Sequence, residues 1–181
     1  DTVQYREKRA LPRHVRRAMG LRITAAIGAS RCIVNDDVDV ARAIGARGVH
    51  LGPQDRSPQE VRQLWPEVRC IGATANNLER AIHAVSQGVD YLGVGPVYPT
   101  SSKARPAPVL GLEGLRRIVA AVDCPVIAIG GIDSRNVGEV LATGAWGVAV
   151  LSCVVAAADP RAAAARMRER IDRCLAGGLA V

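Results

Sequence analysis

The residues of this chain best suited to anion chemistry are its two lysines. Lysine and arginine together number 24, and only Lys8 and Lys103 are lysines. A lysine supplies a compact point charge, which suits a phosphate group. Gln4 and Arg6 precede Lys8 at a spacing of two, which in a β-strand places all three side chains on one side. This pattern predicts an anion site, and the alternative interpretation is an edge strand with one solvated face.

Polar and acidic residues follow two further apolar segments. The first segment is followed by Asn35, Asp36 and Asp37, and the second by a Gly-Pro-Gln-Asp run that ends at Asp55. If the two segments are neighbouring strands, Asp36 and Asp55 can share one Mg²⁺ that takes its remaining ligands from water and phosphate oxygens. The alternative is ordinary turn and capping chemistry, which is our interpretation of Asp37.

Hydroxyl groups and glycines mark the later segments. Thr100 and Ser102 stand beside Lys103, and a loop of this kind can hydrogen-bond a phosphate. A flexible Ser-rich connector is the alternative. Glycines that follow a strand let backbone N–H groups approach an anion closely, although they also serve tight turns alone. The phosphate contacts predicted on this basis are Gly130, Gly131 and Ser152.

These residues stand at or near the ends of short β-branched segments that alternate with amphipathic helical patterns. The predicted strands are residues 3–8, 32–35, 48–51, 70–74, 91–97, 126–130 and 147–152. Such alternation requires parallel strands and right-handed crossovers, as in a doubly wound sheet or a (β/α) barrel. The phrase Gly-Ala-Xaa-Gly-Val occurs twice and turns a helix end tightly into a strand, which favours the barrel.

The strand count bears on the domain organisation. A (β/α)8 TIM barrel has eight strands, one more than the sequence predicts. We therefore expect an α/β protein in which residues 1–181 form a single barrel domain that lacks its first strand and helix.

Composition argues against several other classes. The net charge is +7, but the arginines are dispersed over helix faces and no nucleic-acid-binding motif occurs. No apolar run reaches the roughly 20 residues needed to span a bilayer. Five cysteines without metal or disulfide spacing indicate a reducing cytoplasm.

His50 lies in a predicted strand, where a buried, hydrogen-bonded imidazole is expected. The sequence shows no recognisable Ser-His-Asp or Cys-His set of catalytic residues.

Taken in order, the segments resemble those of thiamine phosphate synthase over nearly the whole chain. The matching pieces are VQYREK, IVNDDV, GVHLGPQD, IGATA, YLGVGPVYPTSSK and VIAIGGI. The family usually carries serine where Thr74 stands and histidine where Asn76 stands. The resemblance implies an eight-stranded barrel that joins hydroxymethylpyrimidine diphosphate to a carboxylated or plain hydroxyethyl-thiazole phosphate. In the family's reaction the pyrimidine C–O bond ionises first, and the thiazole nitrogen then captures the carbocation.

The resemblance also implies a role for each candidate residue. Arg6, Lys8 and Lys103 would stabilise the departing diphosphate together with Mg²⁺ held by Asp36 and Asp55. Residues implied to orient or bind the substrates are Gln4, Asn35, Thr74, Thr100, Ser102, Gly130, Gly131 and Ser152. The expected partners are small phosphorylated substrates rather than nucleic acid or membrane, and a homo-oligomer is left open. Three alternatives stay open: a related thiazole tautomerase, a phosphate-ligand sensor on the same barrel, and a basic RNA-binding protein.

Overall fold

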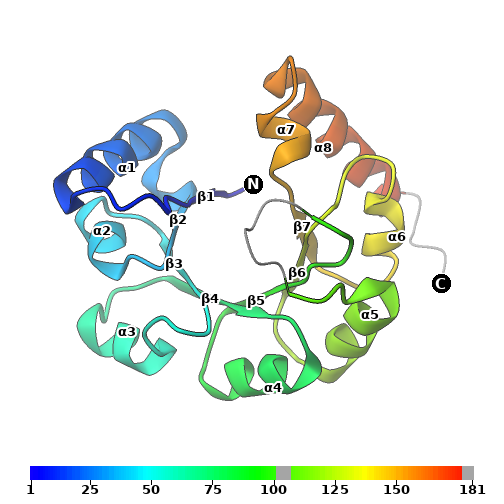
Figure 1. Ribbon diagram of the computed structural model, residues 1–181, viewed down its shortest axis with the longest axis horizontal. Coiled ribbons are helices and arrows are strands. Elements are labelled where there is room, and N and C mark those ends of the chain that lie inside the picture. The colour runs from blue at the N-terminus through cyan, green and yellow to red at the C-terminus, as the bar shows by residue number, and fades with distance from the viewer. Residues whose placement is uncertain (101–106, 177–181) are drawn as a thin grey trace. The chain divides into compact units, whose positions relative to one another are not determined.

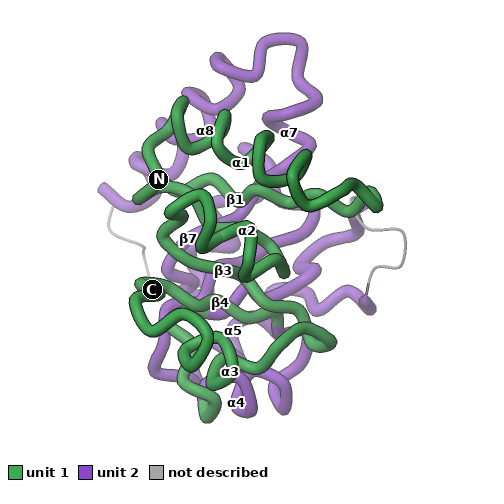
Figure 2. The backbone as a smooth tube through the Cα atoms, turned by 90° about the vertical axis from the view of Figure 1, so that its left-hand side faces the viewer, with its two compact units in different colours: residues 1–74, 86–91 green, residues 75–85, 92–181 purple. Residues whose placement is uncertain are grey.

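The chain divides into two compact units in a computed structural model that describes residues 1–100 and 107–176. Unit 1 comprises Asp1–Thr74 and Ser86–Tyr91, and unit 2 comprises Ala75–Val85 and Leu92–Val181. Figure 2 draws the two units in different colours. The expectation of a single barrel domain over residues 1–181 stays a prediction.

Strands and helices alternate along the chain, as the sequence predicts (Figure 1). The strands are β1 (Val3–Tyr5), β2 (Cys32–Asn35), β3 (Gly48–Leu51), β4 (Cys70–Ala75), β5 (Tyr91–Val94), β6 (Val126–Ile129) and β7 (Gly147–Ala149). The helices are α1 (Arg13–Ile27), the 3-10 turn η1 (Ala29–Arg31), α2 (Val38–Ala43), α3 (Pro58–Leu64), α4 (Leu78–Ser86), α5 (Gly111–Ala121), α6 (Val137–Leu141), α7 (Ser152–Val155) and α8 (Pro160–Ala176).

The paired strands run parallel within each unit. In unit 1, β1 to β4 pair in chain order, and in unit 2, β5 to β7 do the same. The predicted α/β class with parallel strands is thereby confirmed. Closure of a barrel, and a strand and helix before Val3, stay predictions.

The core of unit 1 explains why its strands are apolar throughout. Val34 and Val49 are partners in the β2–β3 register, and both are almost fully buried. Met19, Ile23 and Ile27 of α1 pack against the same cluster. Ile33, which points to the opposite face of β2 from Val34, is also almost fully buried. Both faces of these strands are therefore covered, which accounts for their continuous apolar runs. Close strand packing also requires Gly48, because a Cβ there would lie 1.7 Å from the Cys70 carbonyl oxygen.

Side-chain caps begin two helices of unit 1, α2 and α3. The Asp37 side chain accepts the Val40 N–H at 3.0 Å, which confirms Asp37 as the cap of α2. Ser57 and Glu60 form a reciprocal capping box at the start of α3. These caps fix the two loops that carry Asp36 and Asp55.

Unit 2 has its own buried layer. Val94 and Ala128 are partners across β5 and β6, and both are fully buried. Leu115 of α5 and Val140 of α6 are also fully buried, and Met167 of α8 is nearly so. Across both units, the helices that the structure describes include none long and apolar enough to cross a membrane.

Several predicted strands are shorter in the structure. The 3–8 strand ends at Tyr5, because the Arg9 N–H bonds the Glu7 side chain at 2.8 Å and turns the chain locally. The 91–97 strand ends at Val94, because Pro96 has no N–H to continue the ladder.

The last two strands also end early. The 126–130 strand ends at Ile129, because Gly130 and Gly131 adopt positive φ. The 147–152 strand ends at Ala149, and Ser152 instead begins α7, whose first turn bonds back to the Leu151 carbonyl.

Candidate functional site

Asp36 adopts an unusual backbone conformation directly after β2. Its φ of 64° lies in the left-handed region, which few residues other than glycine occupy. Its N–H donates to the His50 carbonyl at 2.9 Å, so the turn is tied to the neighbouring strand β3. Such a conformation is often found at functional sites, where the surrounding structure holds it in place.

Asp55 meets Asp36 from the loop that follows β3. Its carboxylate accepts the Gly52 N–H at 2.6 Å and is hydrogen-bonded to the Asp36 carboxyl group. Partial burial, followed by this contact with Asp36, raises the pKa of Asp55. Two carboxyl groups can share a hydrogen bond only when one holds a proton, so the pair favours a proton or another cation between them.

Lys8 joins the same cluster from the loop after β1. Its ammonium group forms an ion pair with Asp36 and also lowers the pKa of Asp55. The side chain of Lys8 remains half exposed, at 52%, so the charge still reaches solvent. Lys8, Asp36 and Asp55 therefore meet at adjoining strand ends of unit 1, as their predicted positions require.

The carboxylate pair is compatible with a Mg²⁺ ion, which often binds one or two protein carboxylates and leaves its other positions to water and phosphate. In residues 1–100 and 107–176, no group of three or more His, Cys, Asp or Glu side chains could hold a metal alone. A bound ion would thus take its remaining ligands from water or phosphate oxygens.

Other predicted residues of unit 1 flank this cluster. Asn35 is the last residue of β2 and is half-buried. Arg6 is exposed in the loop after β1, because the strand ends at Tyr5 and not at Lys8. That Arg6 shares one side with Gln4 and Lys8 stays a prediction.

A chain of side-chain hydrogen bonds runs beside the carboxylates within unit 1. Gln4 hydrogen-bonds the Tyr91 hydroxyl group, which lies 3.0 Å from Nδ1 of His50. Nε2 of His50 lies 2.8 Å from the Thr74 hydroxyl group. The prediction that His50 is a buried, hydrogen-bonded imidazole is confirmed, since it is 8% exposed.

The sequence analysis did not predict that Tyr91 takes part in this series of hydrogen bonds. A usable signal was Gly72 in the predicted strand before it. A Cβ at Gly72 would lie 2.1 Å from Cζ of Tyr91, so the glycine makes room for the phenol ring. Glycine inside a strand often marks such a close approach.

Unit 2 carries the residues predicted to hold a second phosphate. Gly130 and Gly131 have φ values of 101° and 66°, and the Gly130 carbonyl accepts the Tyr98 N–H at 3.0 Å. Thr100 is half-buried, and Ser152 is exposed at the start of α7. Ser102 and Lys103 lie outside the described residues.

Comparisons with known proteins identify the family of this chain. Residues 1–154 match the family model described as thiamine monophosphate synthase. The chain is 46% identical over 171 residues to thiamine-phosphate synthase of Chloroflexus aurantiacus, covering 94% of this chain and 79% of that one. It is 42% identical over 179 residues to the synthase of Methanoculleus marisnigri, covering 98% and 85%.

A solved structure agrees with these sequence matches. Thiamine phosphate pyrophosphorylase from Pyrococcus furiosus superposes with a TM-score of 0.86 at 42% identity, covering 96% of this chain and 84% of that one. The similarity extends beyond the N-terminal segments to both units.

Proposed function

The chain belongs to the thiamine monophosphate synthase family, and from this we propose that it joins hydroxymethylpyrimidine diphosphate to hydroxyethyl-thiazole phosphate. The products are thiamine phosphate and diphosphate. The observation that carries the proposal is the cluster of Lys8, Asp36 and Asp55 in a chain that matches the family over most of its length.

The reaction needs no general base. The bond between the pyrimidine methylene carbon and the diphosphate oxygen breaks, and its electron pair leaves with the diphosphate. The thiazole nitrogen then donates its lone pair to the carbocation, which forms the new C–N bond and a thiazolium ion. The protein therefore acts by stabilising the leaving charge and by aligning the two substrates.

Most residues of the proposed diphosphate subsite belong to unit 1. Lys8 and Arg6 place positive charge where the leaving group gains negative charge. Gln4, Asn35 and Thr74 orient the pyrimidine and its diphosphate. A Mg²⁺ ion held by Asp36 and Asp55 would neutralise phosphate oxygens when bound.

The proposed thiazole phosphate subsite uses residues of the later segments. The backbone amides of Gly130 and Gly131, which both adopt positive φ, bind the phosphate with Thr100 and Ser152. Ser102 contributes a further hydroxyl group, and Lys103 adds a third cation for the leaving diphosphate. We also propose that the protein works in the reducing cytoplasm, since all five cysteines are unpaired.

Mixing both substrates with the protein tests this function. With Mg²⁺ present, we expect thiamine phosphate and diphosphate to form in equal amounts, as followed by mass spectrometry. Removal of Mg²⁺ with a chelator should stop turnover, and its return should restore it. Binding of both substrates without product would indicate a sensor, and isomerisation of a thiazole carboxylate alone would indicate a tautomerase.

A further inference from the structure

Four strands of the fold each contribute one member to the hydrogen-bond chain in unit 1. Gln4 lies on β1, His50 on β3, Thr74 on β4 and Tyr91 at the start of β5. Of these, Gln4 and Thr74 have proposed substrate contacts, whereas His50 and Tyr91 have no assigned role. The two unassigned residues stand between the assigned ones, since Tyr91 bonds Gln4 and His50 bonds Thr74.

The chemistry of the groups indicates which of them donates and which accepts in each of these hydrogen bonds. Burial raises the pKa of Tyr91, so its hydroxyl group keeps its proton at neutral pH. The Gln4 amide can donate an N–H to the phenol oxygen, a contact that lowers the Tyr91 pKa. Nδ1 of His50 lies 3.0 Å from the same hydroxyl group, at the distance of an acceptor for the Tyr91 proton.

This order fixes the imidazole. If Nδ1 accepts, the proton of neutral His50 must be on Nε2, which donates to the Thr74 oxygen at 2.8 Å. The Thr74 oxygen is then an acceptor in this bond, so its own proton can point toward a ligand atom.

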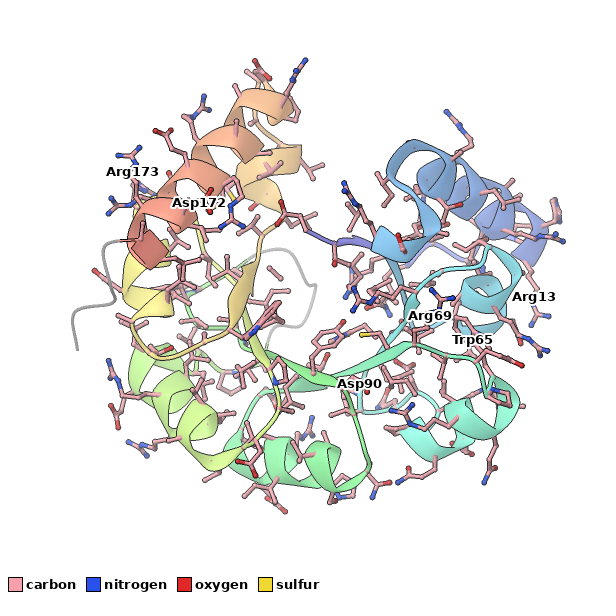
Figure 3. All side chains as sticks on the ribbon, turned by 180° about the vertical axis from the view of Figure 1, so that it is seen from behind. Arg13, Trp65, Arg69, Asp90, Asp172 and Arg173 are labelled. Atoms are coloured by element: carbon pink, nitrogen blue, oxygen red, sulfur yellow. The ribbon has the colours of Figure 1, made fainter. Side chains whose placement is uncertain are left out.

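The surrounding backbone holds Tyr91 and His50 in place. Asp90, labelled in Figure 3, exchanges two hydrogen bonds with Ile71: its N–H donates at 2.7 Å, and its carboxylate accepts at 2.6 Å. This double contact fixes the residue before Tyr91. The His50 carbonyl accepts the Asp36 N–H, so the same residue supports the carboxylate cluster.

We propose that His50, oriented by Tyr91, is a positioning residue that makes Thr74 a hydrogen-bond donor to the pyrimidine diphosphate. The identity of the substrate in this proposal rests on the proposed function. The order of donors and acceptors from Tyr91 to Thr74 does not. The bound acceptor is a ring nitrogen or a phosphate oxygen of that substrate, either of which can receive the Thr74 proton.

Heteronuclear NMR of the wild-type imidazole tests the order directly. We expect His50 to carry its proton on Nε2, and Tyr91→Phe to produce a mixture of the two tautomers. A wild-type proton on Nδ1 would overturn the proposal, whatever the protein catalyses. This measurement needs no turnover, so its failure is distinct from failure of the proposed function.

A matched pair of substitutions at His50 tests the role in turnover. Glutamine can place an N–H where Nε2 stands and keep the bond to Thr74, whereas asparagine can replace only Nδ1. We expect His50→Asn to lower kcat/KM for the pyrimidine diphosphate about tenfold or more, and His50→Gln to stay within about threefold of wild type. Equal losses in the two variants would contradict the proposal.

Removal of a hydroxyl group offers a second comparison. Tyr91→Phe should raise KM for the pyrimidine diphosphate several-fold while KM for thiazole phosphate stays unchanged. Tyr5→Phe is the control, because it removes a hydroxyl bonded at 3.2 Å to the Arg16 carbonyl of α1.

Binding of inorganic diphosphate with Mg²⁺ distinguishes the two possible acceptors of the Thr74 proton. Weaker binding in Tyr91→Phe assigns a phosphate oxygen as the acceptor, and unchanged binding assigns a ring nitrogen.

Discussion

The carboxyl groups of Asp36 and Asp55 are hydrogen-bonded to each other, although they follow different strands. Two carboxylates so close repel each other when both are ionised. Lys8 offsets part of this repulsion through its ion pair with Asp36. The cluster should therefore be a point of local instability that a divalent cation relieves.

The raised pKa of Asp55 gives a pH dependence of stability. The folded state holds this proton more tightly than the unfolded state, in which the pKa is about 3.9. The favourable contribution is thus present at low pH and is lost as pH rises through the folded-state pKa. Asp55→Asn should melt above wild type at pH 7 without divalent cations, and the difference should shrink toward pH 4. A difference that grows on acidification would contradict the assignment.

The left-handed backbone of Asp36 predicts an order among its variants. Asparagine tolerates this conformation better than alanine does, and both substitutions remove the carboxylate. Asp36→Ala should therefore be less stable than Asp36→Asn by about 1 kcal/mol. Urea unfolding without divalent cations measures this difference. Equal stability of the two variants would show that the positive φ carries no strain.

Turnover should depend strongly on two residues of the proposed diphosphate subsite. Lys103→Ala and Asp55→Ala should each lower kcat about a hundredfold or more, because charge stabilisation of the leaving group is lost. Circular dichroism should show an unchanged fold. Asp39→Ala is the control, since Asp39 is an exposed helix residue paired with Arg13. Wild-type rates in Lys103→Ala and Asp55→Ala would remove the subsite assignment.

The capping box of α3 provides a stability prediction independent of function. Ser57→Ala removes the side chain that accepts the Glu60 N–H and should cost about 1 kcal/mol of unfolding free energy. Ser134→Ala is a matched control, because α6 is preceded by Asn136 and has no side-chain cap. Equal losses of unfolding free energy in the two variants would show that the capping box does not contribute to stability.

The sequence predicts the strand centres well and their ends poorly. Consecutive apolar residues buried on opposite faces, such as Ile33 and Val34, are visible as a short apolar run in the sequence. The ends depend on single contacts, such as the Glu7–Arg9 bond that turns the chain after Tyr5. Periodicity cannot detect a contact of this kind, and for this reason the predicted 3–8 strand extends past the observed end at Tyr5.

The residues of the candidate site also differ in how well the sequence predicts them. The positions of Asp36 and Asp55 are predictable, because the carboxyl ends of neighbouring parallel strands share one edge. The role of Tyr91 is not predictable, because it depends on the space left by Gly72, which is visible only once two strands are side by side. Periodicity also places His50 correctly in the core but gives no indication of its partners.

Calorimetric binding of inorganic diphosphate, with and without Mg²⁺, tests the central claim most directly. Wild-type protein should bind diphosphate tightly only when Mg²⁺ is present, and the double variant Asp36→Asn with Asp55→Asn should lose this dependence. The same affinity in wild type with and without the metal would contradict the claim that these two carboxylates hold a metal-bound leaving group.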